Sequence, residues 1–511
     1  MQIIIPMAGF GERFRKAGYA IPKTLIEIAK KPIFQHVIDL FPEEEDFLFI
    51  INSEDGKKFD LERKIKAYLP SAKVVSIFPH KKGPVWTLLQ AEKSISDSEK
   101  IIVNYCDFSC VWDWKAFSLF VKEKDLDGAI PSYKGFHPHT LHSNYYAYLL
   151  CDQKEMVQNI QEKKPFTDFP QKEWASSGTY YFKSGKLLKM ALKEALAQDL
   201  QVNGEYYVSL AYLPLLQQKA KIAPYPLEHF MQWGTPEDVR DFLYWHQALA
   251  LSYKRDLLSL PGTLLMPMAG LGSRFSKHEE YKLPKPLIPV NNMPMVLRAL
   301  FDLPQMKKKI FILRKEHKES LPIIQKYYPQ AEFIILERLT QGQAATCLMA
   351  PINPEEALLI AACDNGMHYD LSQWKAFFEE PKVDIIVFGA KGYPGAIRNP
   401  TAYGWMQIDE EQRVKKVSVK QPFSNLEEDP IITGAFYFKK GRYFLKYAKK
   451  MIHSNRRING EFYVDEIIQL AIEEDLIVKC VSVSAYLCWG TPEDLKTYQY
   501  WKKCFLKWEK L

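Results

Sequence analysis

The sequence of 511 residues contains one pattern twice, at a spacing of about half its length. Residues 7–14 (MAGFGERF) recur as residues 268–275 (MAGLGSRF). Further blocks recur in the same order: 22–25 (PKTL) at 284–287 (PKPL), 106–107 (CD) at 363–364, 177–183 (SGTYYFK) at 433–439 (TGAFYFK), 203–205 (NGE) at 459–461, and 233–238 (WGTPED) at 489–494. Duplication of one complete domain preserves such an order. We therefore predict one domain over residues 1–250, a linker over 251–262 and a second domain over 263–511.

Each copy shows the alternation that is typical of an α/β domain. Short β-rich runs such as 2–6 and 47–51 alternate with helical stretches such as 33–40. This alternation favours mixed, mostly parallel central sheets.

The composition excludes several classes of protein. With 47% hydrophobic and 14% aromatic residues, the whole chain is expected to fold. The formal net charge of +7 suits phosphorylated small molecules but is too small for a nucleic-acid-binding surface. We expect neither a signal peptide nor a membrane-spanning segment. Eight scattered cysteines without a CxxC pair favour the cytoplasm, and a homo-oligomer stays open.

A glycine turn follows the first strand of each copy. Gly9 and Gly11 let backbone N–H groups approach phosphate oxygens closely, and Arg13 adds a cation beside them. Lys23 follows a proline, and an ammonium held there would neutralise the charge that builds up during transfer at an α-phosphorus. The second copy repeats these residues as Gly270, Gly272, Arg274 and Lys285. A single glycine turn is a weak signal, but this recurrence favours a functional site.

The order of strand, Gly-x-Gly-x-Arg and Pro-Lys-Pro-Leu resembles the sugar nucleotidyltransferases, also called nucleotide-sugar pyrophosphorylases. The resemblance extends over both copies, although the first has Thr24 in place of the second proline. It implies two tandem Rossmann-like nucleotidyltransferase domains. It also implies Mg²⁺-dependent transfer of a nucleotidyl group from a nucleoside triphosphate to a phosphorylated small molecule, with a sugar 1-phosphate as the favoured acceptor and pyrophosphate as the other product.

Asp107 and Asp364 are the expected Mg²⁺ ligands. Each ends a strongly apolar strand, and ligands gather at the carboxyl ends of such strands. The family's magnesium-binding aspartate is similarly placed, and a hard oxygen ligand suits Mg²⁺. Similar enzymes carry a second metal-binding aspartate just before the late Gly-Thr, where this sequence has Gln232 and Cys488. The number of metal ions is therefore left open.

The resemblance assigns the remaining site residues by role. Catalysis is expected from Arg13, Lys23, Arg274 and Lys285; nucleotide binding from Ala8, Gly9, Gly11, Gly83, Ala269, Gly270, Gly272, Gln341 and Gly342; and acceptor binding from Lys163, Gly178, Glu205, Lys420, Gly434 and Glu461. The acceptor lysines would bind phosphate and the glutamates would bind sugar hydroxyls. A helix start also explains the glutamates, and a strand bulge explains the two acceptor-site glycines equally well.

The two copies differ where the base and the acceptor would bind. Residues 340–345 (TQGQAA) resemble the family's base-binding Gly-x-Ala segment, whereas the first copy has KGPVWT at 82–87. The copies therefore differ in base preference, or one has lost turnover. His137, His139 and His142 occur only in the first copy. We interpret them as a polar loop that contacts the acceptor rather than as a zinc site, because no Cys or carboxylate completes a ligand set.

Two other functions stay open. A cytidylyltransferase for a non-sugar phosphate such as phosphocholine would use the same triphosphate site. Alternatively, one copy would be a non-catalytic, nucleotide-binding regulatory module. A glycosyltransferase is disfavoured, because neither residues 107–109 nor residues 364–366 form an Asp-x-Asp motif.

Overall fold

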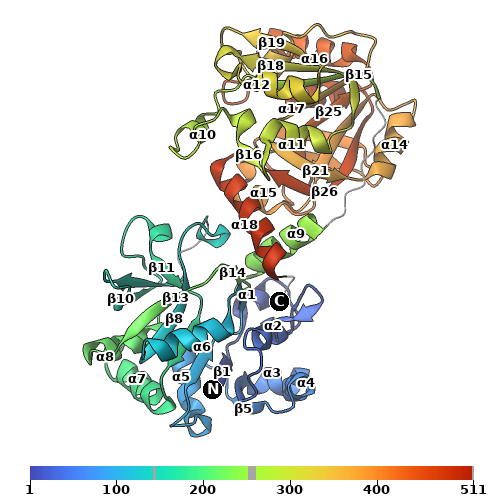
Figure 1. The fold of residues 1–511 in the computed structure, drawn as a ribbon. Coiled ribbons are helices and arrows are strands. Elements are labelled where there is room, and N and C mark those ends of the chain that lie inside the picture. Colours follow the sequence, from blue (N-terminus) through green and yellow to red (C-terminus); the bar gives the residue numbers. More distant parts are fainter. Residues whose placement is uncertain (142–144, 251–259, 509–511) are drawn as a thin grey trace. The chain divides into compact units, whose positions relative to one another are not determined.

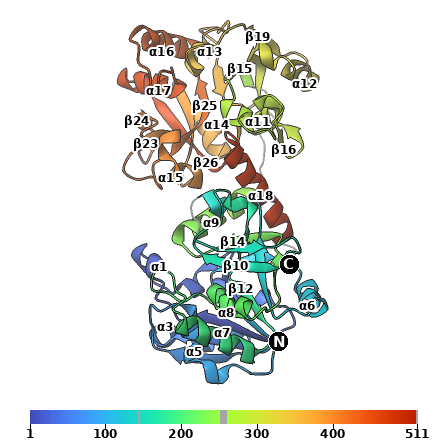
Figure 2. The ribbon, with the colours of Figure 1, turned by 90° about the vertical axis from the view of Figure 1, so that its left-hand side faces the viewer.

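The computed structural model describes residues 1–141, 145–250 and 260–508, and the chain divides into two compact units. Unit 1 comprises Met1–Leu243 together with the chain from Lys503 onward, and unit 2 comprises Tyr244–Lys502. Residues 251–259 of the predicted linker lie outside the described residues, and a strand begins at Leu260. Figures 1 and 2 show the elements of each unit.

The main sheet of unit 1 has the strand order β10-β9-β11-β8-β12-β6-β1-β4-β5, with β13 beside β8. The strands are β1 (Gln2–Met7), β4 (Phe47–Asn52), β5 (Lys73–Ile77), β6 (Ile101–Asn104), β8 (Gly128–Tyr133), β9 (Ala147–Cys151), β10 (Val157–Glu162), β11 (Trp174–Ser176), β12 (Thr179–Phe182) and β13 (Ile222–Pro226). β6, β1, β4 and β5 run parallel, whereas β12 runs antiparallel to β6 and β8. Smaller pairs are formed by β2 (Glu27–Ile28) with β3 (Lys31–Pro32) and by β7 (Phe108–Val111) with β14 (His229–Gln232).

The helices of unit 1 are α1 (Glu12–Lys16), α2 (Ile33–Asp39), α3 (Ser53–Phe59), α4 (Leu61–Tyr68), α5 (Pro84–Gln90), α6 (Trp114–Glu123), α7 (Gly185–Ala197) and α8 (Tyr212–Gln217). α5, α7 and α8 pack together against the sheet (Figure 1). The unit boundary falls inside two long helices, α9 (Pro236–Ala250) and α18 (Pro492–Trp508).

Unit 2 repeats this plan with the sheet order β19-β18-β15-β20-β25-β22-β26-β21, with β23 beside β25 and β24 beside β23. Its strands are β15 (Leu260–Met268), β16 (Pro289–Val290), β17 (Met293–Pro294), β18 (Met306–Arg314), β19 (Glu332–Leu336), β20 (Leu358–Ala361), β21 (Asn365–Tyr369), β22 (Ile385–Ala390), β23 (Gly404–Ile408), β24 (Val414–Val419), β25 (Ile431–Phe438) and β26 (Val478–Cys488). Its helices are α10 (Ser273–Ser276), α11 (Met295–Asp302), α12 (Ser320–Tyr327), α13 (Gln343–Cys347), α14 (Leu371–Glu379), α15 (Pro394–Arg398), α16 (Gly441–His453) and α17 (Val464–Glu473).

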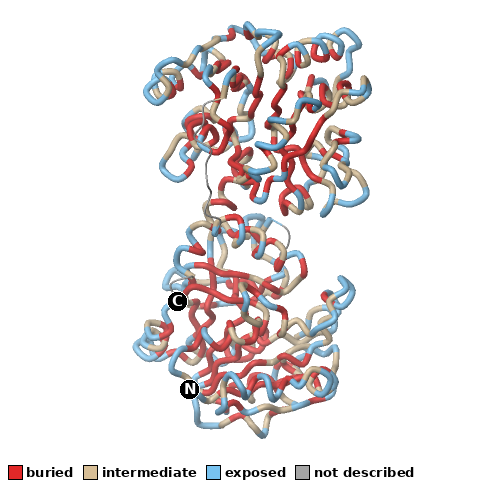
Figure 3. The backbone as a smooth tube through the Cα atoms, turned by 90° about the vertical axis from the view of Figure 1, so that its right-hand side faces the viewer, coloured by how far each residue is buried: buried red, intermediate tan, exposed pale blue. Residues whose placement is uncertain are grey.

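The prediction of two α/β domains with mixed, mostly parallel sheets is confirmed. The strands that precede the glycine turns are buried on both faces, which is why they read as nearly continuous apolar runs. Buried segments run through the middle of each unit (Figure 3). Among the described residues, no helix is both long and apolar enough to cross a membrane.

A glycine starts the same long helix in both units because backbone packs directly against it. A Cβ on Gly185, the first residue of α7, would lie 1.7 Å from the carbonyl oxygen of Ser96. On Gly441, which starts α16, a Cβ would lie 2.4 Å from the carbonyl oxygen of Asn353. Backbone atoms cannot turn aside as a flexible side chain can, so these contacts require glycine.

We predict that Gly185→Ala destabilises unit 1 by about 1–3 kcal/mol, because the added methyl group forces a backbone shift in a packed region. Hydrogen exchange of the β6 and α7 amides measures this loss. The exposed neighbour Lys186 provides the control as Lys186→Ala. Equal protection in the two variants would contradict the steric argument.

Candidate active site

The glycine turn lies at the carboxyl end of β1, before the short helix α1. Gly11 has a φ of 61° and Gly272 a φ of 63°, in the left-handed region that residues with a side chain avoid. A Cβ on Gly9 or on Gly270 would meet no atom within 4 Å. The turn therefore leaves an open face of backbone in both units.

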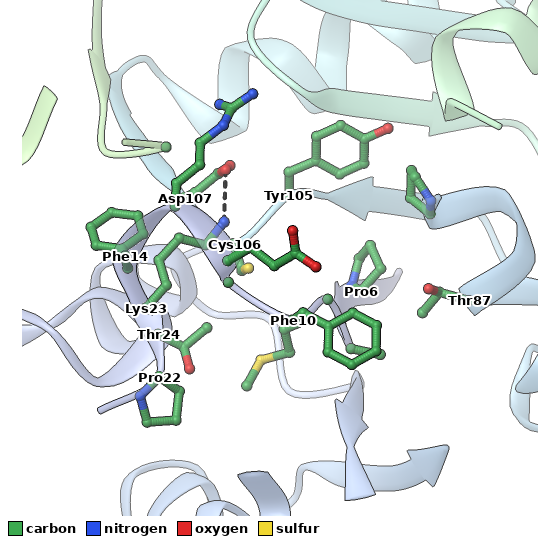
Figure 4. A pocket seen from close by; sticks show the side chains of 18 of the residues that line it. Pro6, Phe10, Phe14, Pro22, Lys23, Thr24, Thr87, Tyr105, Cys106 and Asp107 are labelled. Carbon is green, nitrogen blue, oxygen red and sulfur yellow. Dashed lines mark hydrogen bonds and ion pairs between the residues drawn. The ribbon is translucent and has the colours of Figure 1, made fainter. Parts of the chain in front are cut away.

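In unit 1 this turn forms part of the wall of a cavity of about 560 Å³ (Figure 4). The predicted site residues that line it are Ala8, Gly9, Gly11, Arg13, Lys23, Gly83, Asp107 and Glu205. The other two predicted site residues of unit 1, Lys163 and Gly178, do not line this cavity. His80 and Tyr207 also line it, although the sequence analysis did not single them out. Tyr207 recurs as Tyr463 in the second copy, a signal that the repeat contained.

An ion pair joins the two predicted chemical groups of each unit. Lys23 Nζ lies 2.9 Å from Asp107 Oδ2, as Figure 4 shows, and Lys285 Nζ lies 2.5 Å from Asp364 Oδ2. Both lysines begin a short 3₁₀ turn directly after a proline. Burial disfavours each ammonium, but the neighbouring carboxylate outweighs burial and raises the pKa of both lysines. Both lysines are therefore charged at neutral pH.

The charge of Asp364 is stabilised in return. Burial alone would raise the pKa of its carboxyl group, but Lys285 and, more weakly, Arg274 lower it below the usual range. Arg274, Lys285 and Asp364 thus lie close enough for their charges to interact. This brings together three of the predicted residues of unit 2.

The late Trp-Gly-Thr block lies directly on the aspartate. The backbone N–H of Trp233 donates to the Asp107 carbonyl oxygen at 2.7 Å, and the backbone N–H of Trp489 donates to the Asp364 carbonyl oxygen at 2.9 Å. A Cβ on the next residue, Gly234, would lie 3.3 Å from Asp107 Oδ2, and the same distance applies to Gly490 and Asp364. Glycine at this position leaves the carboxylate face clear in both units.

The two positions where a second metal-binding aspartate was considered hold other interactions. Gln232 Oε1 accepts a hydrogen bond from the Tyr146 hydroxyl group, and its Nε2 donates to Asp238 Oδ2 at 3.0 Å. Cys488 Sγ donates to Asp494 Oδ2 at 3.5 Å, and burial keeps the pKa of this thiol well above its usual range. Among the described residues, no group of three or more His, Cys, Asp or Glu side chains is arranged to hold a metal.

The expectation that this histidine loop contacts the acceptor was wrong for the two histidines that the structure describes. His137 and His139 are each only 1% exposed. His137 Nε2 donates to the Phe230 carbonyl oxygen, and His139 Nδ1 lies 3.0 Å from Asp238 Oδ1. They anchor strand β14 from inside the fold and do not face an acceptor, and His142 lies outside the described residues.

The two predicted acceptor lysines share an uncommon backbone conformation. Lys163 and Lys420 both have a φ of 58°, which costs on the order of 1 kcal/mol for a residue with a side chain. Lys163 Nζ donates to the Tyr207 hydroxyl group and lies 3.7 Å from Glu205 Oε2. Lys420 Nζ donates to the Ala402 carbonyl oxygen at 3.1 Å. The shared strain indicates that both units hold this lysine in one defined place.

Backbone conformation and packing explain why glycine occurs at two pairs of predicted site positions. Gly178 and Gly434 have φ values of 98° and 81°, and the register of β25 against β22 shifts near the latter, as a bulge would produce. A Cβ on Gly83 would lie 2.7 Å from the backbone nitrogen of Tyr206, and a Cβ on Gly342 would lie 2.5 Å from that of Phe462. Acceptor and nucleotide binding by these residues stay predictions.

The segments where base binding was predicted make different side-chain contacts in the two units. In unit 1, His80 Nε2 lies 3.2 Å from Thr87 Oγ1. In unit 2, Arg457 donates to Gln341 Oε1 at 2.6 Å and lies over the Phe462 ring. The two units therefore offer different polar groups next to Gly83 and Gly342.

A buried carboxyl group accompanies the acceptor lysine of unit 1. Glu162, the last residue of β10, is 9% exposed and accepts a hydrogen bond from Ser209 Oγ at 2.6 Å. Burial raises the pKa of Glu162 to about 7, although Ser209 and Lys163 oppose that shift. The sequence analysis missed this residue, because the second copy has Val419 next to its lysine.

One family model and several known proteins match the sequence. The family model described as nucleotidyl transferase matches residues 2–207 and 270–502. The bifunctional protein GlmU of Campylobacter jejuni is 24% identical over 224 residues, which are 43% of this chain and 49% of that protein. The mannose-1-phosphate guanylyltransferase catalytic subunit beta of Drosophila pseudoobscura is 25% identical over 194 residues, 37% of this chain and 50% of that protein. The chain thus spans about half the length of these curated relatives.

Among solved structures, the nucleoside-diphosphate-sugar pyrophosphorylase of Vibrio cholerae is 22% identical to this chain. The match has a TM-score of 0.40 and covers 47% of this chain and 99% of that chain.

The raised pKa of Glu162 predicts a pH dependence for unit 1. The folded state keeps the proton up to about pH 7 whereas the unfolded state releases it near 4.5. The contribution of protonated Glu162 to the free energy of unfolding is therefore fully present below pH 4.5. Up to roughly 3 kcal/mol of it is lost as the pH rises to 7. We expect Glu162→Gln to flatten this part of the profile, measured by hydrogen exchange of β6 amides at pH 5 and 7. The exposed Glu123→Gln is the control, and an unchanged profile in Glu162→Gln would refute the assignment.

Proposed function

The chain belongs to the nucleotidyl transferase family, whose model matches most of both units, and from this premise we propose a specific reaction. The protein transfers a nucleotidyl group from a nucleoside triphosphate to a phosphorylated small molecule and releases pyrophosphate. A sugar 1-phosphate is the favoured acceptor, and nucleotide-sugar synthesis for polysaccharides in the cytoplasm is the proposed setting.

The observation that carries this proposal is the Lys–Asp pair beside an open glycine turn. In unit 1 the turn, Lys23 and Asp107 line one cavity. In unit 2, Lys285 and Asp364 form the same pair. A cation and a carboxylate that could bind a metal ion, next to the open backbone of the glycine turn, suit a triphosphate. Both copies of the repeat retain this arrangement, which favours a functional role for it.

Catalysis rests on positioning and on electrostatic stabilisation. An oxygen of the acceptor phosphate attacks the α-phosphorus in line, the bond from that phosphorus to the bridging oxygen breaks, and pyrophosphate leaves with the electron pair. The charged Lys23 or Lys285 neutralises negative charge that grows on the phosphoryl oxygens. The acceptor lysine, Lys163 or Lys420, holds the acceptor phosphate and reduces its repulsion from the triphosphate.

The aspartates fit a magnesium ion held jointly with the nucleotide. Asp107 and Asp364 each offer an oxygen ligand beside a glycine that leaves the carboxylate face clear. Mg²⁺ bound there would supply positive charge to the triphosphate. Gln232 and Cys488 offer no carboxylate, so we propose one protein carboxylate in each unit.

Two specificities follow from the differences between the units. His80 in unit 1 and Arg457 with Gln341 in unit 2 present different groups where the base is expected. The same difference supports a second candidate function, in which one unit binds a nucleotide but does not turn it over and so regulates the other.

We expect pyrophosphate release to require both substrates and magnesium, and to divide between Asp107 and Asp364. The test combines each of five nucleoside triphosphates with sugar 1-phosphates, inositol 1-phosphate and phosphocholine. Asp107→Ala removes the activity of unit 1, and Asp364→Ala that of unit 2, because each change deletes the proposed metal ligand. Loss of all activity in only one variant would identify the other unit as regulatory. Metal-dependent release by the double variant would refute the site.

We predict that Lys23→Met lowers kcat of unit 1 by about 10²–10³-fold, since a preorganised cation facing the transition state is lost. Single-turnover rates in an Asp364→Ala background isolate unit 1. The exposed Lys122 on α6 gives the control variant Lys122→Met. An unchanged kcat with a raised KM would instead assign Lys23 to binding alone.

A further inference from the structure

Three positions around the acceptor lysine change together between the units. Glu162 on β10 lies opposite Ala147 on β9. In unit 2 the corresponding antiparallel pair is Val419 on β24 and Gly404 on β23. The strand register establishes this equivalence, and the lysine that follows confirms it. The backbone N–H of Lys163 donates to the carbonyl oxygen of Tyr146, the residue before Ala147. The backbone N–H of Lys420 likewise donates to the carbonyl oxygen of Tyr403, the residue before Gly404.

The third position lies four residues after the acceptor glutamate in each copy. It is Ser209 in unit 1, whose hydroxyl group donates to Glu162. In unit 2 it is Asp465, in the first turn of α17. A Cβ on Gly404 would lie 2.2 Å from Asp465 Oδ1. The carboxyl group of unit 2 therefore occupies the space that glycine leaves on β23.

The carboxyl group has thus moved from a strand to a helix while it stays beside the lysine. Burial raises the pKa of Asp465 to about 6, and the charge of Lys420 opposes this shift. Burial and the charge of Arg274 lower the pKa of Lys420, and Asp465 opposes this shift, so the charges of Lys420 and Asp465 interact. Among the described residues, the hydrogen bond to the Asp465 carboxylate comes from its own backbone N–H. A half-buried carboxylate with so few donors costs stability, and a ligand with hydroxyl groups would supply the missing donors.

We propose that Asp465 determines the acceptor specificity of unit 2 by accepting hydrogen bonds from hydroxyl groups of the phosphorylated acceptor. Its oxygens reach the acceptor from the start of α17, whereas the carboxyl group of unit 1 comes from the end of β10. The two units therefore select polyol phosphates whose hydroxyl groups are arranged differently. This inference rests on the proposed function, because it takes Lys420 as the anchor of the acceptor phosphate.

The test compares acceptor binding by Asp465→Asn and by the parent protein. Both are full-length chains in a Lys163→Met background, so that calorimetry reports on unit 2. The probes are inorganic phosphate, glucose 1-phosphate, mannose 1-phosphate, inositol 1-phosphate and phosphocholine. We expect at least one hydroxylated phosphate to bind tenfold or more weakly to Asp465→Asn, and inorganic phosphate to change by less than twofold. Glu466→Gln on the same helix, whose partner is Arg456, is the matched control and should change nothing.

An exchange variant provides a second measurement. Gly404→Ala, Val419→Glu and Asp465→Ser together rebuild the arrangement of unit 1. In the Lys163→Met background, we expect the order of affinities of this variant for the hydroxylated probes to become that of unit 1. The order of unit 1 is measured separately in a Lys420→Met chain with an otherwise unchanged unit 2. Because the added Cβ meets no aspartate in this combination, the exchange removes the steric conflict that Gly404→Ala alone would cause.

Several outcomes would overturn the inference. Equal weakening of every probe would indicate a structural role for Asp465, and no weakening would indicate no role. A larger loss for phosphocholine than for the polyol phosphates would indicate recognition of an ammonium group. Pyrophosphate release by the parent protein is measured separately. If Asp465→Asn releases pyrophosphate with the same acceptor preference as the parent protein, only this inference is refuted. If the acceptors bind selectively but no substrate pair releases pyrophosphate, only the proposed reaction is refuted.

Discussion

The ion pair between the lysine of the Pro-Lys turn and the aspartate at the strand end holds the site together. Removing charges from water is costly, and a partly buried pair is retained only where both partners are held in good geometry. Here Lys23 is held by its 3₁₀ turn, and Asp107 lies in the short connection between β6 and β7. The Asp107 carbonyl oxygen also accepts the Trp233 N–H. Three segments far apart in the sequence therefore meet at one carboxylate, beside the glycine turn.

The chemistry explains which parts of this arrangement the two units share. Transfer at an α-phosphorus makes the same demand for any base and any acceptor, and the Gly turn, Lys, Asp and late glycine are the same in both units. Base and acceptor differ from one substrate to another. The units differ in the polar groups near Gly83 and Gly342, which include His80 in unit 1 and Arg457 in unit 2, and in the carboxyl group beside the predicted acceptor lysine, which is Glu162 or Asp465. Under the proposed function, the shared residues would serve the reaction and the differing residues its specificity.

The sequence predicted features that depend on local geometry or on apolar strands. The glycine turns, the strand-end aspartates and the α/β alternation belong to this class, because each is written in a few consecutive residues. The burial of His137 and His139 was not predictable, since it depends on β14 pairing with β7 across more than a hundred residues. Glu162 and Asp465 were missed for a related reason. Neither recurs at its own position, and only the strand register shows that one replaces the other.

The exchange of the carboxyl group also constrains the order in which it arose. An alanine at position 404 excludes the present position of the Asp465 carboxylate, because the alanine Cβ would lie 2.2 Å from the carboxylate oxygen. The side chain on β23 therefore had to be absent before Asp465 adopted its present position. Glu461 also lies close enough to Lys420 for their charges to interact. A glutamate at position 419 would therefore add a third carboxylate beside Lys420, and repulsion among like charges accounts for the apolar Val419. Under this reasoning the three positions form one steric and electrostatic unit, so any one of them has to be interpreted together with the other two.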